Sequence, residues 1–229
     1  MQSQEPPPPI HLLPPEGAEE ADAASPVDIA PATEGGEGPH LGLVKFRVVL
    51  AVTGSIAAFR AADIASQMTK LGVEVEVILT SAALKFITPL TFQALTRREV
   101  YTDESPDMRN GQPLHISLAD NATLVLVAPA TAHVLAQYAL GLAPDLLTST
   151  LLALPADTPV LIAPAMNGKM WLHPAVQQNV ETLRSRGVEF IGPDEGLLAC
   201  GYEGVGRMDP IERILASVTA RLEALPECG

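Results

Sequence analysis

The sequence has 229 residues, of which 47% are hydrophobic and 18% are charged. This length and composition fit one globular domain, or at most two small ones, with enough chain to bury a core. The formal net charge of -13 disfavours nucleic acid and anionic membranes as partners, because both repel an acidic chain. Aromatic residues make up only 4%, which also disfavours a stacking platform for single-stranded nucleic acid.

Cysteine usage and the first residues predict a reducing, cytoplasmic setting. Cys200 and Cys228 are the two cysteines, which is too few for a disulfide framework. No apolar run reaches the roughly 20 residues that a membrane span needs. The opening stretch MQSQEPPPPIHLLPPEGAEE lacks the basic and long apolar regions of a secretory signal peptide.

Residues 1–44 differ sharply in composition from the rest of the chain. They contain nine of the 21 prolines and eight acidic residues, with no lysine or arginine. Such a segment buries too little apolar surface to offset its conformational entropy, so we expect it to be disordered. A solubilising extension is the simpler interpretation, and an acidic arm that docks a basic partner is the alternative.

From residue 46 onward, apolar β-branched runs alternate with helical stretches. The predicted strands are 46–52, 73–79, 122–128, 158–163 and 187–192, and the predicted helices are 56–72, 89–100, 143–154, 173–187 and 210–225. Gly72 and Gly187 are expected to close two of the helices. Runs that are apolar on both faces are typical of buried parallel strands. The pattern therefore predicts an α/β fold, a doubly wound parallel sheet of flavodoxin-like or Rossmann-like type with helices on both faces, in one domain spanning 45–229 without internal repeats.

Ligands of such sheets bind at the carboxyl ends of the strands. The first predicted strand ends in Thr53-Gly54-Ser55-Ile56, and the second ends in Thr80-Ser81. Small residues and free N–H groups at the start of a helix can bind a phosphate. Two such turns on one sheet edge indicate a mononucleotide phosphate site, although a tight strand-to-helix turn capped by Ser55 would give the first pattern without a ligand.

Longer motifs occur along the chain from the end of the first predicted strand onward. GSIAAFR begins at Gly54, His115-Ile116 comes next, PATAHV contains Ala130 and Thr131, PAMNGKMW spans 164–171, and ACGYEGVGRM spans 199–208. In this order and spacing they resemble the flavin-containing cysteine decarboxylases, which include the phosphopantothenoylcysteine decarboxylases of coenzyme A biosynthesis. The resemblance covers roughly residues 45–210. In bifunctional relatives a ligase domain follows this domain, and we do not expect one within these 229 residues.

The resemblance implies FMN as the cofactor and 4′-phosphopantothenoylcysteine as the substrate, with 4′-phosphopantetheine as the product. Decarboxylation of a cysteine amide lacks a sink for its electrons, and a flavin that oxidises the CH–SH unit supplies one before returning the electrons. The residues expected at the flavin are Gly54, Ser55, Ile56, Ser81, Ala130 and Thr131. No metal site is expected.

The resemblance also assigns roles to individual side chains. His115 is the candidate proton shuttle, because imidazole titrates near neutral pH. Asn167 is expected to bind the substrate carboxylate, and its neutral amide avoids stabilising the anion that must break down. Met166, Met170 and Trp171 are expected to wall an apolar substrate pocket. The structural alternatives are a histidine at a helix entry, an asparagine in a turn and hydrophobic side chains in ordinary packing.

Cys200 lies in the glycine-rich stretch LLACGYEGVGRM, which predicts a mobile flap. In the family this flap closes on the substrate and its cysteine donates a proton in the reductive step. A buried, inert thiol is the structural alternative. Arg207 of the same element is assigned to substrate binding, with a surface ion pair as the alternative. Cys228 matches no motif.

Two positions depart from the family pattern. His133-Val134 replaces the usual Asn-Thr, and in relatives that asparagine lies close to the flavin and the substrate. Pro144 replaces an acidic residue near the start of the predicted helix 143–154, a milder change because proline is tolerated in a first turn.

Two rival functions remain open. One is an oxidative decarboxylase of a peptide C-terminal cysteine, which the retained Cys200 argues against and His133 mildly favours. The other is a regulatory binding protein built on the same scaffold, with the acidic segment docking a partner. The family forms trimers, sometimes assembled into dodecamers, with each flavin site between subunits. A homotrimer or higher homo-oligomer that binds a small-molecule substrate, and neither nucleic acid nor membrane, is therefore expected.

Overall fold

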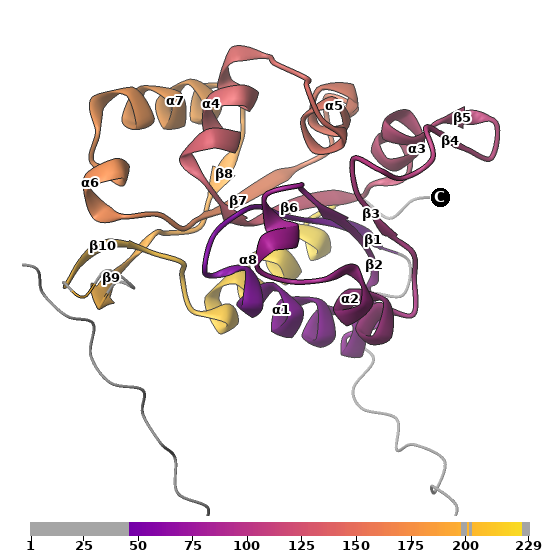
Figure 1. The fold of residues 1–229 in the computed structure, drawn as a ribbon, viewed down its shortest axis with the longest axis horizontal. Helices are drawn as coiled ribbons and strands as arrows, with labels where there is room; N and C mark the ends of the chain where they lie inside the picture. Colours follow the sequence, from indigo (N-terminus) through magenta and orange to yellow (C-terminus); the bar gives the residue numbers. More distant parts are fainter. Residues whose placement is uncertain (1–45, 198–200, 202, 226–229) are drawn as a thin grey trace, which may run out of the picture. The chain divides into compact units, whose positions relative to one another are not determined.

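The computed structural model describes residues 46–197, 201 and 203–225. Its central feature is a six-stranded parallel sheet in the order β3-β2-β1-β6-β7-β8 (Figure 1). The strands are β1 (Arg47–Val52), β2 (Glu74–Leu79), β3 (Val100–Tyr101), β6 (Leu124–Ala130), β7 (Val160–Pro164) and β8 (Glu189–Phe190). The chain runs outward from β1 to β3, returns to place β6 beside β1, and continues outward to β8.

This order confirms the predicted α/β fold with a doubly wound parallel sheet. It is the strand order of dinucleotide-binding folds, in which the direction of winding reverses at the centre of the sheet and leaves a crevice there. The reversal falls between β1 and β6. Any ligand of this sheet is therefore expected beyond the carboxyl ends of these two strands.

Helices cover both faces of the sheet (Figure 1). One face is covered by α1 (Ala58–Lys70), α2 (Pro89–Thr96) and α8 (Ile211–Glu223). The other is covered by α3 (Leu114–Asn121), α4 (Ala132–Leu140), α5 (Leu146–Ala153) and α7 (Pro174–Ser185). The remaining short elements are η2 (Ala83–Lys85), α6 (Gly168–Trp171), the pair β4 (Met108–Arg109) and β5 (Gln112–Pro113), and the pair β9 (Asp194–Leu197) and β10 (Glu203–Arg207).

Two hydrophobic cores, one on each face of the sheet, account for the continuous apolar runs in the sequence. In β1, Val48 and Leu50 point into the core beneath α1, whereas Val49 and Ala51 point into the core beneath α3 and α4. All four side chains are fully buried. A central strand of a doubly wound sheet has no solvent face, so polar residues cannot alternate along it.

The five predicted strands are all present in the central sheet, whereas its sixth strand, β3, and the short pairs β4–β5 and β9–β10 lie outside the predicted strands. Residues 89–100 were predicted as one helix, whereas α2 ends at Thr96 and Val100 begins β3. Arg97 adopts a left-handed conformation (φ 56°) that ends the helix. The chain then reaches the edge of the sheet within three residues.

Helix boundaries differ from the prediction where a side chain caps the helix. The helix predicted over 143–154 begins at Leu146, because the carboxylate of Asp145 accepts hydrogen bonds from the N–H (2.8 Å) and the hydroxyl (2.6 Å) of Thr148. Pro144 therefore precedes the cap and does not lie in the first turn. The glycines predicted to close α1 and α7 do so with positive φ, 89° at Gly72 and 88° at Gly187.

Three helices, α3, α4 and the four-residue α6, lie outside the predicted helix ranges. Both α3 and α4 follow loops that were interpreted for their motifs, and neither has a strong amphipathic stripe. The hydroxyl of Thr131 accepts a hydrogen bond from the N–H of Val134 and caps α4 at its start, while Gly141 closes it. Within the described residues, no helix combines the length and the apolar character needed to cross a bilayer.

Candidate functional site

Two adjoining cavities lie at the carboxyl ends of the central strands. The smaller, about 340 Å³, is lined mainly by apolar side chains and includes Ser55, Ile56, Met166, Asn167, Met170 and Arg207. The larger, about 630 Å³, is more polar and includes Thr80, Ser81, Asp103 and His133. Gly54, Thr131, Ala132 and Met170 line both. The site therefore lies where the winding of the sheet reverses, as the fold predicts.

Thr53 holds the two loops at this point together. Its buried hydroxyl donates a hydrogen bond to the carbonyl of Pro129 (2.7 Å) and accepts one from the N–H of Thr131 (3.1 Å). The N–H of Thr53 also donates to the carbonyl of Pro129 (3.3 Å). These three bonds fix the spacing between the end of β1 and the end of β6. Thr53 was not among the predicted site residues, because its contribution is to the backbone geometry.

The predicted phosphate turns lie together, and their backbone donors are unused. Among the described residues, the N–H groups of Gly54, Ile56 and Ser81 have no hydrogen-bond acceptor. Two of these residues line the 630 Å³ cavity and one lines the adjoining cavity. Ser55 does not cap α1, since Ala57 is the N-cap and the Ser55 hydroxyl accepts a hydrogen bond from its N–H (3.3 Å). Unpaired donors near a helix start suit an anionic group.

Asp103 is a further residue of this cavity that the sequence did not identify. Its carboxylate accepts a hydrogen bond from the Ser81 hydroxyl (2.5 Å) and another from the N–H of Leu146 (3.0 Å). The side chain thus joins the end of β2 to the start of α5. Ser81 can offer its hydroxyl to an anion only by rotating away from Asp103, whereas its N–H remains available.

The smaller cavity has the character expected of a slot for a flat, apolar ring. Ile56 and Met170 are 60% and 49% exposed, so their side chains are available to a ligand. Met166 packs against the second core and contributes to the same wall. The structure thus places Met166 and Met170 on the wall of this cavity. Trp171 is only 8% exposed and belongs to the core beneath α7, so it does not wall the cavity.

Asn167 lies on the wall of the smaller cavity, at the start of α6. Its Oδ1 accepts a hydrogen bond from the N–H of Lys169 (2.9 Å), so it caps this four-residue helix. β10 packs closely against the same loop, where the Gly206 carbonyl accepts a hydrogen bond from the N–H of Met166 (2.9 Å). A Cβ at Gly206 would lie 2.3 Å from the Met166 carbonyl oxygen, and φ there is 134°. Only glycine fits this close approach.

Arg207 lines the smaller cavity from β10 and forms the surface ion pair that was its structural alternative. Its NH2 donates to Asp194 Oδ2 (2.5 Å) across the β9–β10 pair. This hydrogen bond lowers the pKa of the Asp194 carboxyl below its usual value. The pair therefore persists at neutral pH and is lost only as the pH falls through that lowered pKa.

His115 does not lie with Asn167. It is the second residue of α3 and lines a separate cavity of about 440 Å³ together with Asp103, Asp107 and Asp145. Asp103, Pro144 and Asp145 line this cavity and the 630 Å³ cavity alike, so the two adjoin. In one chain, the predicted proton shuttle and the predicted carboxylate-binding residue thus belong to different cavities.

The other residues that the sequence analysis discussed are Thr131 and Ala130, the family departure His133, and the two cysteines. Thr131 lines both central cavities, whereas Ala130 is fully buried one residue before it. His133, the departure from the family pattern, is exposed on the wall of the 630 Å³ cavity. Cys200 and Cys228 lie outside the described residues. Within the described ranges, no cluster of three or more His, Cys, Asp or Glu side chains is placed to hold a metal ion.

Comparison with known proteins identifies the family. The profile described as Flavoprotein matches residues 40–223. The chain belongs to the flavoprotein family. It is 43% identical over 180 residues to a probable phosphopantothenoylcysteine decarboxylase of Streptococcus mutans, covering 77% of this chain and 98% of that one. It is 49% identical over 168 residues to the coenzyme A biosynthesis bifunctional protein CoaBC of Bacillus subtilis, spanning 41% of that longer relative and 73% of this chain.

Solved structures of this family share the fold. A PPC decarboxylase variant in complex with pantothenoylaminoethenethiol superposes with a TM-score of 0.73 at 32% identity, covering 79% of this chain and 100% of that one. The FMN-dependent cysteine decarboxylase SpaF superposes with a TM-score of 0.69, also at 32% identity, covering 80% and 99%. The resemblance drawn from the motifs is thereby confirmed at the level of the family.

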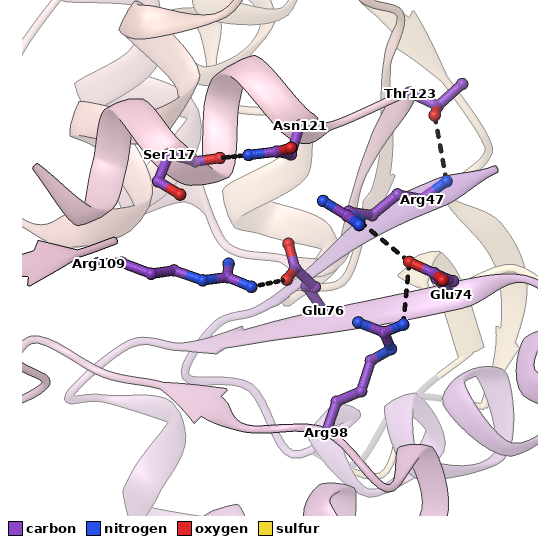
Figure 2. A network of polar contacts seen from close by, with 8 residues as sticks. All are labelled: Arg47, Glu74, Glu76, Arg98, Arg109, Ser117, Asn121 and Thr123. Atoms are coloured by element: carbon purple, nitrogen blue, oxygen red, sulfur yellow. Dashed lines mark hydrogen bonds and ion pairs between the residues drawn. The ribbon is translucent and has the colours of Figure 1, made fainter. Parts of the chain in front are cut away.

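A buried ion pair supports the segment that carries His115 (Figure 2). Glu76 points from β2 toward α3 with only 2% of its side chain exposed, and its Oε1 accepts a hydrogen bond from Arg109 NH2 of β4 (2.7 Å). This bond raises the pKa of Arg109, and the guanidinium also stacks on Tyr101, 5.3 Å from the ring centre. β5 then leads directly into α3, so the pair anchors the hairpin that precedes His115.

We predict that Arg109→Met lowers the free energy of unfolding by about 3 kcal/mol, because it leaves the Glu76 carboxylate buried without a partner. Urea titrations at matched protein concentration measure the change. The double variant Glu76→Met/Arg109→Met should regain most of the loss. The matched control is Arg98→Met, which breaks an ion pair with Glu74, a neighbour of Glu76 in β2. The side chains of this pair are 34% and 36% exposed, so its loss should cost less than about 1 kcal/mol. A cost for Arg109→Met no larger than the control would contradict the prediction.

Proposed function

We propose that this chain is an FMN-dependent decarboxylase that converts 4′-phosphopantothenoylcysteine to 4′-phosphopantetheine in coenzyme A biosynthesis. The observation that carries the proposal is the position of Asn167 on the wall of an apolar cavity that adjoins a polar cavity with unused backbone donors. The relative that this chain nearly spans is named a probable phosphopantothenoylcysteine decarboxylase. The bifunctional relatives are much longer, so only this half of their activity is proposed for the chain.

The residues present fit FMN. The N–H groups of Gly54 and Ser81 would hold its phosphate in the polar cavity, and Ile56 and Met170 would pack against its ring in the apolar one. When bound, FMN would take up the electrons of the substrate CH–SH unit and later return them. Neighbouring solved structures are described as FMN-dependent cysteine decarboxylases and as an FMN-binding protein, which supports this cofactor.

Asn167 would orient the substrate carboxylate for departure. Its amide is neutral, so it positions the carboxylate without the ground-state stabilisation that a cation would add. The surrounding side chains of Met166 and Met170 exclude water from that carboxylate. Loss of carbon dioxide leaves its electron pair delocalised on the sulfur-bearing unit of the substrate, and an apolar environment favours this spread charge over the localised charge of the carboxylate.

His115 would accept the thiol proton, and we propose that it does so in the site of a neighbouring subunit. Within one chain it lines a different cavity from Asn167. The family arrangement, with each flavin site between subunits, would bring the His115 cavity of one subunit against the central cavities of the next. We therefore propose a homotrimer, or a larger assembly of trimers, located in the cytoplasm. Residues 45–229 would form the catalytic domain, and the acidic residues 1–44 lie outside the described residues.

The flavin assignment predicts that the purified protein is yellow and binds FMN in preference to FAD and riboflavin. The polar cavity has donors for a single phosphate, so riboflavin lacks the anion and FAD adds a group without a binding site. Absorbance spectra and equilibrium titrations of the apoprotein measure the preference. A protein that gains no flavin absorbance on adding FMN would refute the assignment, and a preference for FAD would show that the phosphate site is misassigned.

His115→Asn and Asn167→Asp should each retain FMN and lose turnover. The first removes the proton acceptor, and the second sets a carboxylate against the substrate carboxylate. If each site takes the two residues from different subunits, co-expression of the two variants should restore part of the wild-type rate, because some mixed sites contain both native residues. Near-wild-type turnover by either variant alone would exclude the role of its residue. No recovery in verified mixed oligomers would exclude the shared site.

Cys200 separates the proposed reaction from oxidative decarboxylation of a peptide cysteine. Anaerobic incubation with phosphopantothenoylcysteine should yield phosphopantetheine, whereas Cys200→Ser should release carbon dioxide but accumulate the enethiol, two hydrogens lighter. A serine hydroxyl has a far higher pKa than a thiol and donates its proton more slowly. Mass spectrometry reads the products, and Cys228→Ser is the matched control. Phosphopantetheine formed at the normal rate by Cys200→Ser would remove this proton donor from the mechanism.

A further inference from the structure

A cavity of about 550 Å³ adjoins the apolar cavity and shares no lining residue with the 630 Å³ cavity, where the flavin phosphate is proposed to bind. Ile56, Ala57, Arg207 and Met208 line both, and Phe59, Arg60 and Pro210 complete the outer one. Asn167 lines the inner cavity and not the outer one, whereas Arg60 lines the outer cavity and not the inner one. A molecule with its carboxylate at Asn167 can therefore extend past Met208 and end at Arg60.

The outer cavity is the cationic end of this region. Arg60 and Arg207 both line it, whereas no lysine or arginine of the described part of the chain lines the 440 Å³ or the 630 Å³ cavity. The Arg60 NH1 group donates a hydrogen bond to the Met208 carbonyl (3.1 Å), which orients the guanidinium. Among the described residues Arg60 forms no ion pair with a carboxylate. Its charge is thus uncompensated, in a chain with a net charge of -13.

The positive charge of Arg207, unlike that of Arg60, is partly compensated by a neighbouring carboxylate. Its guanidinium pairs with Asp194 and lies against the backbone of Gly196, where a Cβ would come within 2.9 Å of the Arg207 Cζ. The side chain remains 46% exposed. The negative charge of Asp194 repels an anionic ligand at this position. Arg60 therefore attracts such a ligand more strongly than Arg207 does, and Arg207 would interact with both Asp194 and the ligand.

We propose that Arg60, assisted by Arg207, binds the 4′-phosphate of the substrate in the outer cavity. The inference rests on the proposed function, because it assigns the two ends of that substrate to two cavities. A guanidinium offers several N–H donors to phosphate oxygens and keeps its charge at every physiological pH. The flavin phosphate has its own donors in the 630 Å³ cavity, which Arg60 does not line.

This assignment makes Arg60 a specificity determinant within the family. A peptide with a C-terminal cysteine presents its carboxylate to Asn167 as well, but it carries no phosphate at the far end. Binding energy at Arg60 is then available only to the phosphorylated substrate. Because this contact is far from the reacting carbon and is made equally in the ground state and the transition state, its loss should raise KM with little change in kcat.

The test compares phosphopantothenoylcysteine with pantothenoylcysteine, which lacks only the phosphate. The wild-type protein should have a higher kcat/KM for the phosphorylated substrate. Arg60→Gln should reduce the ratio of the two kcat/KM values by about 10- to 100-fold, the loss expected for hydrogen bonds to a charged group. Arg60→Lys should retain part of the ratio. The control Arg98→Gln, at the opposite end of the strands, should leave the ratio unchanged.

Two further measurements test whether Arg60 binds the phosphate of the substrate or the phosphate of FMN. Calorimetry with phosphopantothenate and pantothenate, neither of which can react, should show a preference for the phosphorylated acid that Arg60→Gln removes. The FMN content and dissociation constant should be the same in Arg60→Gln and wild type. Loss of FMN from that variant would mean that Arg60 holds the flavin phosphate instead, and would overturn the inference.

The outcomes distinguish this inference from the proposed function. If the wild-type protein converts neither cysteine substrate, the proposed function fails. If it converts both with the same kcat/KM, the decarboxylase activity stands and the phosphate subsite does not exist. If it prefers the phosphorylated substrate but Arg60→Gln keeps that preference, the phosphate binds elsewhere and the assignment to Arg60 is wrong.

Discussion

The hydroxyl of Thr53 joins the two strands between which the sheet reverses its winding. It is buried, donates to the Pro129 carbonyl and accepts from the N–H of Thr131, so it connects the two strands beyond Ala51 and Val127, the last residues paired between β1 and β6. Both central cavities begin at the residues that follow this connection, Gly54 and Thr131. Their walls are therefore set by a bond within the core, and the backbone donors are positioned before any ligand arrives.

Close backbone approach determines the rest of the apolar cavity. Gly206 brings β10 against the loop that carries Asn167, and Gly54 leaves room for Ala82, since a Cβ at Gly54 would lie 2.5 Å from the Cβ of Ala82. Gly206 thus allows the β9–β10 pair to pack against the loop after β7, and Gly54 allows the loop after β1 to pack against the loop after β2. A side chain at either position would separate two walls of the site.

The sequence was sufficient to predict the fold class, because strands buried on both faces leave an unmistakable apolar run. Short elements were not predictable in the same way. β3 has two residues and is separated from the end of α2 by only three residues, so local propensity could not distinguish the two elements. The side chain of Trp171 was assigned to the pocket by its motif, yet it faces the core, since residues one apart on a short helix point in different directions.

The pairing of site residues depended on tertiary contacts that the sequence does not display. Ser81 and Asp103 are separated by 22 residues, and only the meeting of β2 with β3 brings their side chains together. Glu76 lies in a run that predicts a buried strand, where a carboxylate is unexpected until Arg109 is seen to reach it from the β4–β5 hairpin. Arg60 belongs to the GSIAAFR motif, but its relation to Arg207 required the return of β10 beside α1.

The cavities differ in the charge of the side chains that line them, and this difference affects how the proposed substrate binds. The His115 cavity is lined by three aspartates, and the outer cavity by two arginines. Both ends of the proposed substrate are anionic, but the phosphate carries more charge than the carboxylate, so the arginines favour the orientation with the phosphate in the outer cavity and away from the three aspartates. The cysteine end must then approach His115 from the inner cavity. That approach requires the His115 cavity to face Asn167, and the proposed contact between subunits is the arrangement that allows it.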